Sequence, residues 1–142
     1  MKKGEDFVGV TVSYMCHDGE GNYLFQKRGP NCRDEHGRWD TGGGALEFGD
    51  TVENTLIKEL EEEYGVIPLE TEFLGFRDIH RTHEGKPTHW VSLNYRVLVD
   101  RTKVYNAEPH KFEAIAWHRL DNLPDPLHSQ LPVFFEVFGE RL

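Results

Sequence analysis

The sequence is poor in cysteine, has no long apolar run and carries few basic residues relative to its acids. Cys16 and Cys32 are the only cysteines among 142 residues. They are too few for the disulfide framework of a small secreted domain, and their spacing matches no zinc-binding pattern. No segment approaches the roughly 20 apolar residues of a membrane-spanning helix. Residues 1–3 are followed by the polar residues 4–6, where a signal peptide needs an apolar stretch. We therefore expect a protein of the reducing cytoplasm that does not associate with membranes.

The shortage of positive charge also limits the kinds of partner. Sixteen lysines and arginines stand against twenty-five aspartates and glutamates, a net charge of -9, which argues against stable binding to nucleic acid. The 37% hydrophobic content, with 14 glycines and 7 prolines, excludes disordered and fibrous classes. A length of 142 residues matches one domain, so we expect a single domain over residues 1–142. The sequence leaves open whether that domain forms a homodimer.

The negative charge is concentrated in one short segment. Residues 47–63 contain one base, Lys58, and seven acids: Glu47, Asp50, Glu53, Glu59, Glu61, Glu62 and Glu63. This segment carries -6 of the net charge, and the other 125 residues carry only -3. A local acid cluster on an otherwise nearly balanced chain is typical of a cation site more than of a device for solubility.

Apolar periodicity predicts one clear helix, over residues 51–64, where Val52, Leu56, Leu60 and Tyr64 recur at every fourth position. Asp50 is the expected N-cap, with Glu53 completing a capping box, and Gly65 the expected C-terminal stop. Strands are expected over residues 7–16, 23–26, 73–76, 89–99 and 114–118, with a turn at 82–88 and a short helix at 129–138. This order predicts a layered α/β or α+β domain.

Three carboxylates share one face of the predicted helix. Glu59, Glu62 and Glu63 stand at i, i+3 and i+4, where like charges destabilise a helix by about a few tenths of a kcal/mol per pair. They also lie toward the C-terminal end, which disfavours anions. A hard divalent cation would offset both costs, because Mg²⁺ and Mn²⁺ prefer carboxylate oxygens. The alternative is an ordinary solvated face. The glycines at 42–44 favour the cation, because they let the backbone approach a ligand closely.

Together these residues resemble the Nudix box of the Nudix (MutT-like) hydrolases. That motif is Gly, five residues, Glu, seven residues, then Arg-Glu-aliphatic-any-Glu-Glu-any-Gly-aliphatic. Here Gly44 is followed after five residues by Asp50, and seven residues later the segment 58–66 reads Lys-Glu-Leu-Glu-Glu-Glu-Tyr-Gly-Val. Every spacing matches, and only Asp50 for Glu and Lys58 for Arg depart. Weaker likeness includes residues 24–28, 39–44 and 112–124.

The resemblance implies an α/β/α sandwich around a central mixed β-sheet. It also implies hydrolysis of a nucleoside diphosphate linked to another group X, with Mg²⁺ or Mn²⁺ as cofactor. The metal ligands would be Glu59, Glu62 and Glu63, with one of them activating water, and the Gly43 carbonyl as a further ligand. Lys58 would occupy the place of the arginine that orients a box carboxylate. A metal fits the chemistry, since an acidic site cannot bind an anionic diphosphate unaided.

Further candidate site residues lie outside the box. A further catalytic and metal-binding carboxylate is expected from a later loop, with Glu113 favoured over Glu108. Arg28 in the polar loop before the box is a candidate for binding phosphate. Trp39 is a candidate for stacking on the base, with a structural plug beside the box as the alternative. Specificity is expected to lie in residues 28–40, 77–89 and 104–112.

His80, His83 and His89 are close in sequence, but their spacing fits no helical metal pair and a turn intervenes at Gly85. Surface or substrate-loop histidines are therefore favoured over a zinc site.

The leading hypothesis is a Mg²⁺-dependent pyrophosphohydrolase of a nucleoside triphosphate or related small nucleotide. The alternative is a catalytically silent Nudix-fold module that binds a nucleotide or sugar phosphate. An acidic protein–protein adaptor would leave the glycines unexplained.

Overall fold

The computed structural model describes all residues 1–142 and is built on one mixed β-sheet. The seven strands are β1 (Gly9–His17), β2 (Asn22–Arg28), β3 (Trp39–Asp40), β4 (Gly42–Ala45), β5 (Glu70–His83), β6 (Lys86–Leu98) and β7 (Phe112–Arg119). The helices are α1 (Val52–Tyr64) and α2 (Leu131–Phe138), with short 3₁₀ turns at Arg101–Lys103 and Gly139–Arg141.

The sheet is mixed because β1 pairs in parallel with β6, while the other pairings are antiparallel. Its strand order is β3-β2-β1-β6-β5, with β4 added to β1 and β7 added to β2. β1 meets β2 only near its C-terminal end, at His17 and Tyr23, and pairs with β4 over residues 11–14. Over residues 11–14, the neighbour of β1 is therefore the glycine-rich β4 and not β2.

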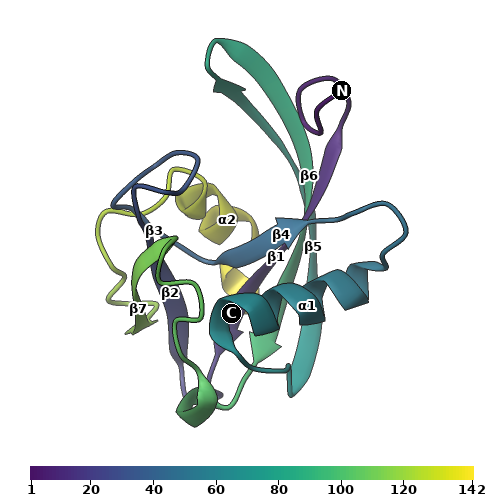
Figure 1. Ribbon diagram of the computed structural model, residues 1–142. Coiled ribbons are helices and arrows are strands. Elements are labelled where there is room, and N and C mark those ends of the chain that lie inside the picture. The colour runs from purple at the N-terminus through teal and green to yellow at the C-terminus, as the bar shows by residue number, and fades with distance from the viewer.

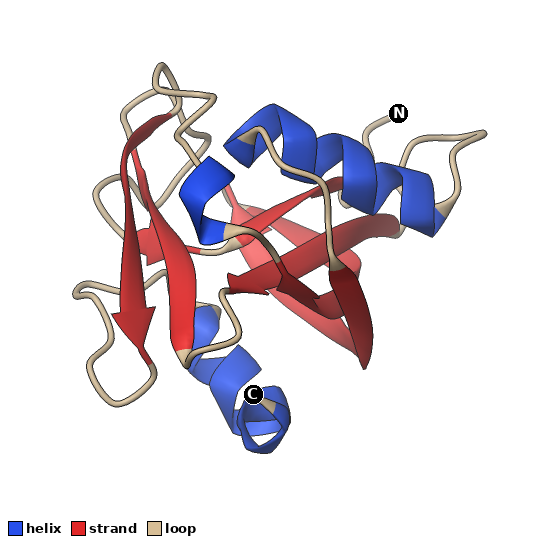
Figure 2. Ribbon diagram, turned by 90° about the horizontal axis from the view of Figure 1, so that it is seen from below, coloured by secondary structure: helices blue, strands red, loops and turns tan.

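The two α-helices lie on opposite sides of the strands, as Figures 1 and 2 show. On one side, Leu56, Leu60 and Tyr64 of α1 pack with Val12 and Val97 of the sheet in the larger apolar cluster. On the other side, Leu131 of α2 packs with Met15 and Phe25 in the smaller one. This confirms the predicted α/β/α layering around a mixed sheet. Neither helix is long and apolar enough to cross a membrane.

The start of α1 differs from the sequence prediction. Thr51, not Asp50, is the N-cap: its backbone is extended, and its hydroxyl accepts the N–H of Asn54 at 3.0 Å. The backbone N–H of Asp50 instead bonds to the carbonyl of Glu47 in the preceding turn. The predicted stop is confirmed, since Gly65 has φ 68° and donates its N–H to the carbonyl of Glu61.

The β5–β6 hairpin is longer than predicted. The expected turn at 82–88 shrinks to Glu84 and Gly85, both with positive φ, and pairing runs from Glu70 opposite Leu98 to His83 opposite Lys86. The residues near the tip are polar and show no apolar alternation, because this part of the hairpin has no core on its outer face. The outer ends of the two strands could therefore not be predicted from the sequence pattern. In Figure 1 the hairpin projects beyond the rest of the sheet.

Candidate active site

The candidate site lies where α1 crosses β4. β4 runs antiparallel to β1, with Gly43 opposite Ser13 and Gly42 opposite Tyr14. The close approach requires glycine: a Cβ on Gly42 would lie 2.3 Å from the Tyr14 ring, and one on Gly43 would lie 2.7 Å from the Val12 carbonyl oxygen. These glycines therefore allow β4 to pack closely against β1 and allow the glutamates of α1 to approach its backbone.

Glu63 is the buried carboxylate of the site, with 2% of the residue exposed. Its Oε1 accepts hydrogen bonds from the Tyr14 hydroxyl at 2.7 Å and from the Gly43 N–H at 3.0 Å. Its Oε2 is buried and has no hydrogen-bond partner. Buried polar atoms are nearly always satisfied, so this oxygen is an exception that is free to accept a ligand.

Glu59 lies one helical turn earlier, directly over Gly44. A Cβ on Gly44 would lie 2.2 Å from the Glu59 carboxyl carbon, so a side chain at position 44 would displace the carboxylate. Glu62 is exposed and makes no side-chain hydrogen bond or ion pair, although its charge acts on Glu59. The structure thus places Glu59 and Glu63 against the glycine strand, with Glu62 at the solvent edge.

Burial raises the pKa of both inner acids. Burial raises the pKa of Glu63 to about 7, although the hydrogen bonds from Tyr14 and Gly43 oppose the shift. Burial raises the pKa of Glu59, and the charge of Glu62 raises it further. A carboxyl with a strongly raised pKa beside a cavity, as Glu63 has, is typical of functional sites.

The loop before β7 is held against the end of α1. The N–H groups of Tyr105 and Ala107 bond to the carbonyls of Tyr64 and Glu63 at 3.2 and 3.0 Å, satisfying acceptors that a helix end leaves free. This docking brings Glu108 and Lys111 within electrostatic reach of Glu59: Glu108 raises its pKa and Lys111 lowers it.

A small polar cavity opens beside Glu63. It has a volume of about 190 Å³, and its lining includes Arg28, Asp40, Gly43, Glu63 and Lys111. The guanidinium of Arg28 forms ion pairs with Asp34 at 3.1 Å and Asp40 at 3.4 Å. The lining of the cavity therefore combines the carboxylates of Glu63 and Asp40 with the cationic side chains of Arg28 and Lys111.

A neighbouring cavity of about 330 Å³ shares Arg28 and Asp40 with the first and extends under the β5–β6 hairpin, where Ile79, Arg81 and Trp90 line it. Its wall holds an ion-pair network. Arg81 pairs with Glu35 at 2.7 Å and Asp34 at 3.5 Å, while His128 contacts Glu35 at 2.8 Å.

The remaining predicted residues lie farther out. Lys58 is exposed and makes no hydrogen bond or ion pair, although its charge lowers the pKa of Glu59. Glu113 is exposed on β7, with Lys27 of β2 at 3.6 Å. Trp39 packs edge-on against His118 and joins the cluster beneath α2, and it lines neither of the two cavities.

Sequence reasoning missed several residues that the fold brings to the site. Tyr14 comes from an apolar strand and carries no local sign of contact with Glu63. Asp40 reaches the cavity only through β3, and burial raises its pKa. Lys111 lies 48 positions after Glu63 along the chain. Only its place in a predicted specificity loop hinted at a role.

The donor set suits a hard divalent cation. It combines the unpartnered Glu63 Oε2 with the carboxylates of Glu59 and Glu62, and such oxygens are the ligands that Mg²⁺ and Mn²⁺ prefer. A bound cation would also favour the ionised form of Glu63.

Comparison with known proteins shows the family and the fold of this chain. The chain matches the family model described as "NUDIX domain" over residues 8–138. Its fold is similar to a MutT NUDIX hydrolase from Burkholderia pseudomallei, with a TM-score of 0.81 and 27% identity over 93% of this chain and 98% of that chain. It is also similar to a MutT protein from Methanosarcina mazei Go1, with a TM-score of 0.78 and 19% identity over 99% and 97% of the two chains. The second likeness supports the fold alone.

Proposed function

Because the chain belongs to the NUDIX domain family and is a Nudix pyrophosphohydrolase, we propose that it cleaves a pyrophosphate bond in a nucleoside triphosphate or a related small nucleotide, with Mg²⁺ as cofactor. The observation that carries the proposal is the unpartnered Glu63 Oε2, buried beside the glycine strand. The fold holds this oxygen in place although nothing in the chain satisfies it, at a cost that a bound cation removes.

The proposed ligands of Mg²⁺ are the carboxylates of Glu59, Glu62 and Glu63 and the carbonyl of Gly43. When bound, the ion would neutralise charge on the phosphates and lower the pKa of an attacking water. Mn²⁺ has the same ligand preference and is expected to substitute for it.

The chain's own groups have distinct proposed roles. Tyr14 and the Gly43 N–H hold Glu63 in one orientation through hydrogen bonds of 2.7 and 3.0 Å. Lys111 and Arg28, across the small cavity, would bind phosphate oxygens. Arg28 is suited to this because its guanidinium can engage two oxygens at once, and Asp34 and Asp40 already orient it.

The two cavities support the proposed substrate class. The polar cavity of about 190 Å³ beside Glu63 suits phosphates, and the adjoining cavity of about 330 Å³ offers the apolar Ile79 and Trp90 to a nucleoside. Both shapes favour a small nucleotide substrate.

The test is a panel of nucleoside triphosphates, oxidised dGTP, ADP-ribose, sugar nucleotides and dinucleoside polyphosphates, assayed with Mg²⁺ and with excess chelator. Released phosphate and pyrophosphate are measured. We expect turnover of at least one small nucleotide with Mg²⁺ and none with chelator. Turnover that persists in chelator would contradict the metal dependence. Binding without turnover across the panel would favour the silent module.

A further inference from the structure

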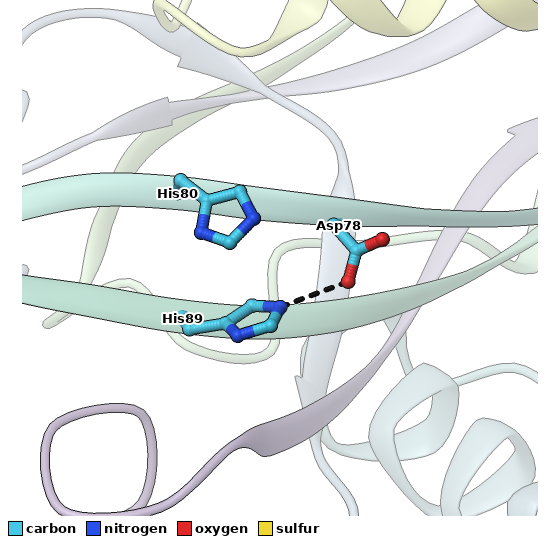
Figure 3. Close-up of side chains that lie close together, drawn as sticks. All are labelled: Asp78, His80 and His89. Atoms are coloured by element: carbon cyan, nitrogen blue, oxygen red, sulfur yellow. Dashed lines mark hydrogen bonds and ion pairs between the residues drawn. The ribbon is translucent and has the colours of Figure 1, made fainter.

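A second group of metal-ligating side chains lies on the β5–β6 hairpin, away from the carboxylates of α1. Asp78 and His80 are two residues apart on β5, and His80 is paired across the strands with His89 of β6. Because side chains alternate between the faces of a strand, this register puts all three on one face. Figure 3 shows them turned toward one another from the two strands.

The three side chains are within the reach of one ion. His89 Nε2 and Asp78 Oδ1 are 2.8 Å apart, and the rings of His80 and His89 have centroids 4.2 Å apart. One potential ligand atom from each residue lies within 4.8 Å of the other two. Ligands of a tetrahedral zinc ion, bound at 2.0–2.2 Å, are about 3.3 Å apart, so small side-chain rotations complete the geometry.

These donors are free of competing partners. Apart from the His89–Asp78 contact, their side chains make no hydrogen bond or ion pair, and no lysine or arginine engages Asp78. The other His-carboxylate group, Asp34, Glu35 and His128, differs sharply. Its carboxylates are already engaged by Arg28, Arg81 and Ser129, with which an ion would have to compete.

We propose that Asp78, His80 and His89 bind one divalent transition-metal ion of the zinc class. Two imidazole nitrogens and one carboxylate oxygen suit Zn²⁺, and Cu²⁺ and Ni²⁺ as competitors, but not Mg²⁺, which prefers oxygen. His89 would carry its proton on Nδ1, so that the Nε2 lone pair faces the metal and the ring stays neutral. Water completes the coordination, since Asp78 and His80 are exposed.

The site would join the two strands of the hairpin. Ile79 and Arg81, on the opposite face of β5, line the cavity of about 330 Å³ next to the active site. A metal ion linking His80 to His89 would therefore hold one wall of that cavity from outside while taking no part in hydrolysis.

Calorimetric titration of the purified protein with ZnCl₂, in buffer with excess Mg²⁺ to occupy the α1 carboxylates, tests the proposal. We expect one zinc ion per chain. Affinity should fall about tenfold or more in His80→Ala and in His89→Ala, and should be unchanged in His83→Ala, a histidine of the same hairpin on the other face. Glu63→Gln should keep zinc binding, because it alters only the α1 site.

Hydrogen exchange supplies an independent readout. Zinc should slow amide exchange in peptides covering residues 78–91 of the wild type, and should have no such effect in His80→Ala. Circular dichroism of each variant checks that the fold is retained. Absence of zinc binding by the wild type would overturn the proposal, as would binding lost in Glu63→Gln but retained in both histidine variants.

Discussion

Burial of the Glu63 carboxyl destabilises the fold, and the proposed role of Glu63 in binding a metal ion would explain why it is there. Its carboxyl is buried, one oxygen is unpartnered, and burial raises its pKa to about 7. Nothing in the apolar core around α1 requires a charge there. A destabilised group of this kind is typical of a site shaped for a ligand.

Replacing Glu63 with Gln should lower kcat on the order of 10²-fold or more while preserving the fold. The amide keeps the shape of the side chain but loses the charge that would bind the metal. Steady-state kinetics with the best nucleotide of the panel measures the effect. The matched control is Glu61→Gln, an exposed glutamate of the same helix, which should stay within about twofold of wild type. Equal activity in the two variants would refute the role of Glu63.

The same variant should melt at a higher temperature than wild type in chelator at pH 8. Above pH 7 the folded wild type must hold an ionised, buried Glu63, whereas below pH 4.5 it is protonated in both states. The raised pKa therefore costs stability that appears as the pH rises through 4.5 to 7. A lower melting temperature for Glu63→Gln at pH 8 would contradict this cost.

The further carboxylate expected from a later loop is either Glu113 or Glu108. The sequence favoured Glu113 over Glu108. In the structure, Glu108 raises the pKa of Glu59, while Glu113 faces Lys27. We expect Glu108→Gln to lower kcat more than Glu113→Gln, compared under identical conditions with saturating Mg²⁺. A larger loss of kcat in Glu113→Gln would instead favour Glu113 as the further carboxylate.

Among the elements, α1 was predictable and β4 was not. The four-residue repeat of Val52, Leu56, Leu60 and Tyr64 predicted the helix to within one residue of its start. β4 is mostly glycine and has no strand propensity. β4 forms because its backbone pairs with β1. Most of its residues are glycines because larger side chains would collide with Tyr14 and Glu59.

The docking of the segment before β7 could not be predicted either. Its contacts with α1 are backbone hydrogen bonds from Tyr105 and Ala107 to the last turn of the helix, which leave no side-chain signature. Likewise, the register that pairs His80 with His89 depends on a tight turn at Glu84 and Gly85. Nothing in residues 82–88 favours that turn over a wider one, so the sequence alone predicts surface or substrate-loop histidines and not a paired group.

Asp18, in the turn between β1 and β2, should make the stability of the fold depend on pH. Burial raises the pKa of Asp18, but hydrogen bonds from the Asn22 side chain and the Glu20 N–H outweigh it and bring the pKa to about 2. The folded state therefore gains stability above pH 3.8, and that gain is lost as the pH falls toward 2. Asp18→Asn should unfold at a lower denaturant concentration than wild type at pH 6.

The difference between Asp18→Asn and wild type should shrink as the pH approaches 2, because the aspartate is then protonated in the unfolded state and is becoming protonated in the folded state. Asp121→Asn is the control, since Asp121 is exposed and its side chain makes no hydrogen bond. A destabilisation of Asp18→Asn that is the same at pH 2.5 and pH 6 would show that the linkage is absent.

For the whole molecule, the layered fold explains how an acidic chain can handle an anionic substrate. The acids gather on α1, and Arg28, Arg81 and Lys111 line the cavities on the sheet and loop side. The net charge of -9 therefore does not describe the site, where cations of the chain and a bound metal would face the phosphates together.

The most direct test of this account is a crystal structure of the protein with Mn²⁺, read from the anomalous scattering of the metal. We expect an anomalous peak about 2.2 Å from Glu63 Oε2, between α1 and the strand of Gly43 and Gly44, with Glu59 turned toward it. Ordered Glu59, Glu62 and Glu63 side chains directed into solvent, with no manganese between them and β4, would contradict it.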